Sequence, residues 1–206
     1  AAPTPVIPPM KMQTAPVSES GLAAWVALRA EVAACTRCAL HKTRTQTVFG
    51  TGSPQARWLV IGEAPGADED RQGEPFVGRA GQLLTEMLRA VGVSREQVFI
   101  ANVLKCRPPE NRDPTPDEAT SCEDYLKRQI ALIQPRLILV VGRIAAQNLL
   151  QVDTPIGKLR GAVHAYGPAR IPVVVTYHPA YLLRSPGQNA RAWDDLCLAR
   201  DRVAPI

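Results

Sequence analysis

Residues 58–84 read WLVIGEAPGADEDRQGEPFVGRAGQLL, and the pattern of the whole chain can be built outward from them. The stretch begins with a short apolar run that ends in glycine, which predicts a buried strand. Glycine and proline then form a turn, and a helical pattern follows. This order is typical of a phosphate-binding loop, but the turn is crowded with carboxylates. The question is therefore what an acidic loop at the end of a strand holds.

A phosphate-binding loop presents backbone N–H donors and commonly a lysine. Here the loop carries Glu63, Asp68, Glu69 and Asp70 and has no lysine before the helix, so it would repel phosphate. An uncharged ring with N–H donors suits it better, because carboxylates and carbonyls accept hydrogen bonds. Phe76 would offer such a ring a stacking surface, although a lone phenylalanine is more commonly a core residue.

The alternation of strands and helices continues downstream. Further strands are predicted at 98–106, 136–142 and 171–179, and helices at 20–34, 81–92, 115–133, 143–150 and 189–203. Thr115 and Glu118 predict a capping box at the start of the third of these helices. The pattern predicts a three-layer α/β/α fold around a central four-stranded, mainly parallel sheet, with connecting loops at 107–116 and 164–172.

Unusual residues gather at the ends of the predicted strands. The acidic loop follows the first strand, Asn102 lies late in the second, Gly142 ends the third, and His178-Pro179 ends the fourth. Ligands of open α/β sheets bind beyond the carboxyl ends of the strands, so this convergence predicts an active site. Asn102 and His178 could each instead satisfy only local hydrogen bonds.

Length and composition suggest one globular domain at 20–206 in a chain of 206 residues. The formal charge of +5 permits an anionic partner without requiring one. Residues 1–19 are proline-rich and are expected to be a disordered leader or linker. They lack the pattern of a secretory signal, and no apolar run reaches membrane-spanning length, so a cytoplasmic location without a membrane partner is expected.

Five cysteines without an export signal argue against a disulfide framework. Cys35 and Cys38 form a CxxC pair, and Cys106 and Cys122 lie far downstream. Such a wide, asymmetric set suits an iron–sulfur cluster better than structural zinc, which usually takes two close pairs. The alternative is a redox CxxC with two unrelated buried thiols. Cys197, in the last predicted helix, is expected to be a buried apolar residue.

The motifs GEAPGADED, PFVG, ANVLKCRPP and HPAYLL, together with the cysteine spacing, resemble the family 4 uracil-DNA glycosylases. The resemblance runs from about Cys35 to the last helix. It implies a monomer, nucleoid-associated in a prokaryotic cell, that flips deoxyuridine out of single- or double-stranded DNA and hydrolyses its N-glycosidic bond. Free uracil and an abasic site are the implied products. It also implies a 4Fe–4S cluster ligated by Cys35, Cys38, Cys106 and Cys122.

The resemblance assigns roles by position. Phe76 would stack on uracil, Asn102 would read its polar edge, and His178 would donate to the negative charge that develops on O2. Glu69 would crowd the C5 edge and exclude thymine. The uracil-binding residues implied in this way are Gly62, Ala64, Glu69, Phe76 and Asn102.

Glu63 would lie beside the sugar and the attacking water, where negative charge suits a developing cation. The best-known branch of the superfamily has an aspartate at the position of Ala64. Either Glu63 takes part of its role, or catalysis relies more on stabilising the leaving group. At the DNA surface, Leu182 or Leu183 would wedge into the minor groove and the other would be core. Arg184, with Lys42, Arg44, Lys105 and Arg107, could contact phosphates, although each taken alone is more commonly an ordinary solvated charge.

Two rival functions are less consistent with the sequence. A protein that binds or covalently traps uracil-containing DNA would be expected to carry a histidine in a basic inserted loop, and the segment at 105–114 has none. An electron-transfer module would not need Asn102, Phe76 and His178 to converge.

Overall fold

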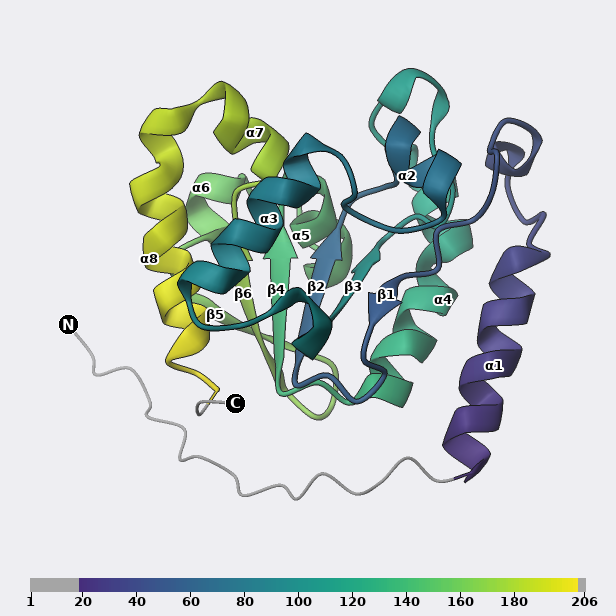
Figure 1. Ribbon diagram of the computed structural model, residues 1–206, viewed down its shortest axis with the longest axis horizontal. Coiled ribbons are helices and arrows are strands. Elements are labelled where there is room, and N and C mark those ends of the chain that lie inside the picture. Colours follow the sequence, from purple (N-terminus) through teal and green to yellow (C-terminus); the bar gives the residue numbers. More distant parts are fainter. Residues whose placement is uncertain (1–18, 204–206) are drawn as a thin grey trace.

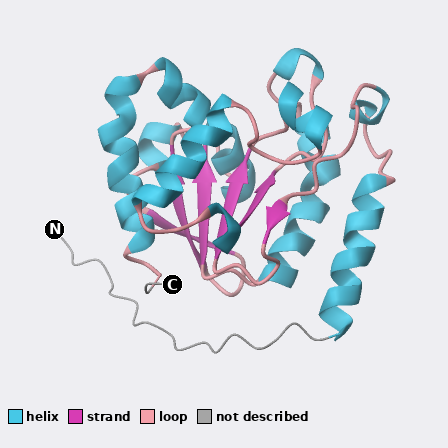
Figure 2. Cartoon of the chain, viewed as in Figure 1, coloured by secondary structure: helices cyan, strands magenta, loops and turns pink. Residues whose placement is uncertain are grey.

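The computed structural model describes residues 19–203 (Figure 1). The predicted leader at 1–19 therefore lies outside the described residues, except for Glu19, which begins α1. Within the described part, helices cover both faces of a central sheet, as Figure 2 shows. The helices are α1 (Glu19–Ala33), α2 (Ala67–Gln72), α3 (Arg79–Ala90), α4 (Pro116–Ile133), α5 (Arg143–Leu150), α6 (Ile156–Leu159), α7 (Pro179–Arg184) and α8 (Asn189–Arg200). No helix among residues 19–203 is long and apolar enough to span a bilayer.

The sheet has six strands in the order β1-β3-β2-β4-β6-β5. The predicted strands are its four central, parallel ones: β2 (Trp58–Gly62), β3 (Val98–Asn102), β4 (Leu137–Val141) and β6 (Ile171–Thr176). Each ends a few residues before its predicted limit or within one residue of it. Central strands buried on both faces give continuous apolar runs, which explains why the sequence revealed them.

The prediction of four strands missed the two edge strands of the sheet. β1 (Thr51–Gly52) and β5 (Val163–Tyr166) pair antiparallel with β3 and β6. β1 has only two residues, and β5 is only partly buried, so neither forms an apolar run. β5 occupies part of the predicted loop at 164–172 and turns back into β6 through Gly167, whose φ is +64°.

The two faces of the sheet bury two hydrophobic clusters. Along β2, Leu59 and Ile61 face α1, α4 and α5, whereas Trp58 and Val60 face α3 and α8. This alternation is the two-residue period of a strand covered on both sides, and it confirms the three-layer architecture. The capping box predicted for α4 is also present, with the Thr115 side chain accepting from the Glu118 N–H. The carboxyl ends of the parallel strands meet at one edge, beside α2 and α7 (Figure 1).

Candidate active site

Gly62 ends β2 beside the end of β3, where it pairs with Asn102. A Cβ placed on Gly62 would lie 2.4 Å from Asn102 Oδ1 and 2.6 Å from Phe76 Cζ. The absence of a side chain therefore lets the amide and the aromatic ring approach the strand end. The structure thus brings together three of the residues predicted to bind uracil.

Asn102 is a buried polar residue with an uncommitted acceptor. Its side chain is almost fully enclosed, with the residue 2% exposed, and its Oδ1 has no hydrogen-bond partner among the described residues. A buried amide oxygen without a partner costs free energy, typically about 1–3 kcal/mol. Such an atom at the carboxyl edge of a sheet indicates a site for a ligand with an N–H donor.

His178 caps the N-terminus of α7, and its Nδ1 accepts a hydrogen bond of 3.1 Å from the Ala180 N–H. The ring proton therefore resides on Nε2, which is left as a donor. Burial lowers the pKa of His178 to about 4, assisted by the charge of Arg184, while Glu69 acts in the opposite direction. At neutral pH the imidazole is uncharged. Gly142, with φ of +104°, lets the histidine lie against the end of β4, since a Cβ there would lie 3.2 Å from His178 Cβ.

The acidic loop turns out to hold backbone amides. Asp70 is buried and accepts from the Thr45 N–H at 3.0 Å. Glu69 Oε1 accepts from the N–H groups of Val77 and Gly78 at 2.9 and 3.2 Å. These two carboxylates tie neighbouring loops to α2. The Glu69 carboxylate supports the loop that carries Phe76. Its predicted role at the C5 edge of uracil stays a prediction.

Phe76 needs that support, because its φ of +55° lies in the left-handed region. This conformation costs roughly 1–2 kcal/mol for a residue other than glycine. Arg95, which the sequence analysis missed, donates to the Pro75 carbonyl at 2.6 Å and holds the other side of the same turn. The ring of Phe76 is buried, and its centroid lies 5.6 Å from that of His178.

Glu63 is half-buried after β2, and Ala64 follows it beside the apolar core. Burial raises the pKa of Glu63 to about 7; the negative charge of Asp113 adds to the effect, and Arg143 opposes it. Asp113 and Arg143 also form an ion pair of 3.4 Å with each other. Glu63 is thus a carboxyl group that changes charge near neutral pH.

The residues predicted to contact DNA divide into exposed and buried ones. In α7, Leu182 is 3% exposed and packs in the core, whereas Leu183 is 42% exposed and Arg184 is also exposed. One of the two leucines is core, as expected, so Leu183 is the one available as a wedge. Lys105 is fully buried and cannot reach a phosphate, which makes that prediction wrong.

The four predicted ligands line one small pocket at the side of the sheet, together with Arg44 and Lys105. Cys35 follows α1, Cys38 precedes a short 3₁₀ helix, Cys106 follows β3, and Cys122 lies in α4. Arg44 donates to Cys106 Sγ at 3.1 Å rather than facing a phosphate. Burial raises the pKa of Cys122 to about 11.

Among residues 19–203, no three His, Cys, Asp or Glu side chains are grouped closely enough to hold a single metal ion. Cys197 lies apart in α8 and is half-buried rather than buried.

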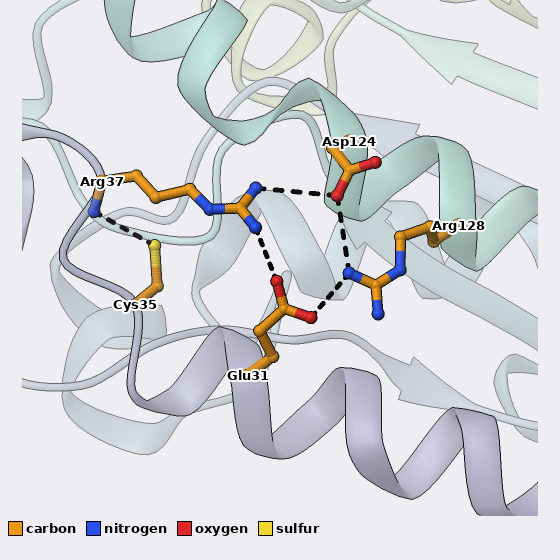
Figure 3. A network of polar contacts seen from close by, with 5 residues as sticks. All are labelled: Glu31, Cys35, Arg37, Asp124 and Arg128. Atoms are coloured by element: carbon orange, nitrogen blue, oxygen red, sulfur yellow. Dashed lines mark hydrogen bonds and ion pairs between the residues drawn. The ribbon is translucent and has the colours of Figure 1, made fainter.

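A charge network braces the loop that carries the CxxC pair (Figure 3). Arg37 pairs with Glu31 of α1 at 2.6 Å and reaches Asp124 of α4 at 3.6 Å, and Arg128 bridges the same two carboxylates. The Arg37 guanidinium also lies 4.3 Å from the Tyr125 ring centroid. Each exposed pair contributes little alone, but together they connect α1 to α4 beside the cysteine pocket.

An enclosed amide, an aromatic ring and a neutral imidazole, gathered at the carboxyl edge of a parallel sheet, form a site that suits a flat, uncharged heterocycle. The family described as the Uracil DNA glycosylase superfamily matches residues 49–197, and the chain belongs to it.

Individual relatives agree with this assignment. The chain is 50% identical over 163 residues to a type-4 uracil-DNA glycosylase of Archaeoglobus fulgidus, covering 76% of this chain and 81% of the relative. It is 46% identical over 166 residues to one of Sulfurisphaera tokodaii, covering 77% and 76%. It is 45% identical over 159 residues to one of Thermotoga maritima, covering 76% and 82%. The resemblance inferred from the motifs is thereby confirmed.

Proposed function

We propose that this protein is a DNA-repair enzyme that flips deoxyuridine out of DNA and hydrolyses its N-glycosidic bond, releasing free uracil and leaving an abasic site. The observation that carries the proposal is that one site contains both an unpartnered acceptor, Asn102 Oδ1, and a neutral His178 that retains an Nε2–H donor. Flipping is required because the bond cannot be reached while the base is stacked in the duplex.

Asn102 selects uracil over cytosine. Uracil presents an N3–H donor beside an O4 acceptor, whereas cytosine presents an N3 acceptor beside an amino donor. The free Oδ1 of Asn102 accepts from N3–H, and the amide nitrogen can donate to O4. Cytosine would place an acceptor against an acceptor and leave the enclosed amide unsatisfied. Phe76 supports the ring from its face.

His178 stabilises the leaving group. When the bond to the sugar breaks, the departing uracil gains negative charge that is shared with O2. The Nε2–H of His178 donates to that oxygen, and the ring needs no proton from solvent because it is neutral from about pH 4 upward. A preorganised donor of this kind typically contributes about 3–4 kcal/mol.

Glu63 acts on the sugar, which is the other partner of the breaking bond. The sugar becomes cation-like in the transition state, and a carboxylate beside it stabilises that charge and accepts a hydrogen bond from the attacking water. Ala64 offers no carboxylate for this work. Of the two possibilities left open by the sequence, we favour the one in which Glu63 takes part of the role.

Leu183 fills the space in the duplex that the flipped nucleotide vacates, and Arg184 contacts a nearby phosphate. Their exposure on α7, next to the turn that carries His178, supports this assignment. Inserting an apolar wedge offsets part of the cost of unstacking.

Such an enzyme works as a monomer in the cytoplasm, at the nucleoid.

The cysteine pocket suits a 4Fe–4S cluster held by Cys35, Cys38, Cys106 and Cys122. Four sulfurs from three segments line one pocket, and the cationic groups of Arg44 and Lys105 lie there to balance ligated thiolates. The bound cluster would be structural, joining the ends of α1 and β3 to α4. Arg44 and the Arg37 network would hold the ligating segments in place.

The test is an alkali-cleavage assay on a labelled oligonucleotide that contains one deoxyuridine, with matched thymine and cytosine oligonucleotides. Multiple-turnover cleavage at uracil alone is the expected result. Binding without cleavage by protein that retains its iron, or a covalent adduct on a denaturing gel, would contradict the proposal in favour of a binding or trapping protein.

A further inference from the structure

Lys105 is a lysine that the fold encloses completely, with 1% of the residue exposed. Burying an ammonium group costs several kcal/mol unless it is paired and hydrogen-bonded. The sequence makes it look like an ordinary surface cation beside a cysteine. Its burial therefore calls for a specific set of partners.

Two neutral groups accept hydrogen bonds from the ammonium. Lys105 Nζ donates to the Asn102 backbone carbonyl and to Gln129 Oε1, both at 2.7 Å. The amide of Gln129 is itself oriented, because its Nε2 donates to the Phe49 carbonyl at 2.8 Å. Lys105 Nζ thus joins the end of β3 to α4, and Gln129 extends the connection to the segment before β1.

The Asn102 carbonyl depends on this bond because the sheet ends beside it. On that side, β3 pairs with β1, whose two residues lie opposite Ile100 and Phe99 only. Asn102 lies beyond the end of β1, so no strand in the part of the chain that the structure describes supplies a donor to its carbonyl on this side. Lys105 supplies the donor that a neighbouring strand would otherwise provide to the Asn102 carbonyl. Asn102 is the residue whose side chain lies at the proposed uracil site.

The other side of Lys105 belongs to the cysteine pocket. The lysine lines that pocket, its backbone hydrogen-bonds Cys122, and Cys106 follows it in the chain. Since the two acceptors of the ammonium are neutral, the thiolates of a bound cluster would supply the negative charge that balances it. One residue therefore contacts both the proposed cluster site and the backbone of the uracil-reading residue.

We propose that Lys105 is a positioning residue that ties Asn102 to the four-cysteine pocket and so sets the affinity for uracil. The inference rests on the proposed function, in which Asn102 reads the base. The lysine touches no substrate; it acts through the Asn102 peptide. Cluster and base recognition are thereby mechanically connected, although the cluster takes no part in the chemistry.

The experiment compares the iron-loaded native protein with Lys105→Met, which keeps the length of the side chain and removes charge and donor. Free-uracil affinity is measured by calorimetry, alongside iron content and single-turnover excision. We expect affinity for uracil to fall about tenfold, the equivalent of one hydrogen bond, in protein that retains iron. Lys127→Met, in an exposed ion pair of α4, is the matched control and should behave as native.

The same substitution in an Asn102→Ala background separates positioning from general destabilisation. If Lys105 acts through Asn102, its loss there should change excision by less than about twofold. The inference would be overturned if Lys105→Met lowered the excision rate equally in the native and the Asn102→Ala backgrounds. Native uracil affinity in Lys105→Met would also overturn it. Should Lys105→Met not fold, Lys105→Gln, which keeps a donor, is expected to weaken uracil binding about threefold, and native affinity would again refute it. Failure of the native protein to excise uracil would refute the proposed function instead.

Discussion

The rings of Phe76 and His178 lie with their centroids 5.6 Å apart and their planes inclined by 32°. Phe76 comes from the turn before α3, and His178 from the N-cap of α7. One group thus offers a stacking face and the other an N–H donor at the same place. A planar base resting on the phenylalanine would therefore present its edge to the imidazole.

Replacing His178 by alanine should lower the single-turnover excision rate by about 10²–10³-fold, because a donor to the developing charge on uracil O2 is lost. DNA affinity should change little, since the histidine acts on the transition state. Rapid quench on a deoxyuridine oligonucleotide, with fluorescence anisotropy for binding, measures both. Small and equal losses in rate and affinity would contradict the assignment.

The excision rate should rise with pH through a midpoint near the pKa of Glu63, about 7 in the free protein. The carboxylate is the active form, so below the midpoint the rate should fall by about tenfold per pH unit. Bound DNA adds negative charge and moves the midpoint upward. Glu63→Gln should be slow and should lose this pH dependence, and a native profile in the variant would exclude Glu63 as the titrating group.

The same shift predicts a change in stability. Because folding raises the pKa of Glu63 from 4.5 to about 7, the carboxyl group favours the folded state below pH 4.5, and this contribution is lost as the pH rises through 7. Glu63→Gln should therefore be more stable than the native protein at pH 8, by on the order of 1 kcal/mol. Thermal denaturation between pH 5 and pH 8, under one ionic strength, would show the difference. A constant gap in Tm across that range would argue against the shifted pKa.

Gly62→Ala should abolish measurable uracil binding, because the added Cβ would lie 2.4 Å from Asn102 Oδ1 and 2.6 Å from the Phe76 ring. Displacing either group disrupts the base site, and the overpacking should also cost about 1–3 kcal/mol in stability. Calorimetry with free uracil and thermal denaturation report the two effects. Gly157→Ala, where a Cβ meets nothing within 4 Å, is the control and should bind uracil as the native protein does.

Cys106→Ser should lose the visible absorbance of a cluster, its iron and sulfide, and much of its folded yield. Serine is a poor ligand for iron in such clusters, and the segments that the cluster joins would lose that connection beside their shared hydrophobic core and the Arg37 network. Cys197→Ser, in α8, should keep the full spectrum. An unchanged spectrum in Cys106→Ser would show that this cysteine is not a ligand.

Much of this protein is determined by its sequence alone. The central strands appear as apolar runs because they are buried on both faces, and the α4 capping box is a local interaction between Thr115 and Glu118. Parallel strands place their carboxyl ends together, so Asn102 and His178 could be assigned to one site without coordinates. The edge strands could not be found in this way, because β1 and β5 lack a continuous apolar pattern.

Only the tertiary structure decided what the charged residues do. Lys105 and Arg44 look like surface cations in the sequence, yet one is enclosed beside Asn102 and the other donates to a cysteine. Glu69 and Asp70 looked like an acidic surface for a ligand, yet they accept backbone N–H bonds from other loops. The physical reason is that burial and pairing depend on contacts between segments distant in sequence. Composition and periodicity report which face is apolar, but they do not report which distant amide or carbonyl will need a charged partner.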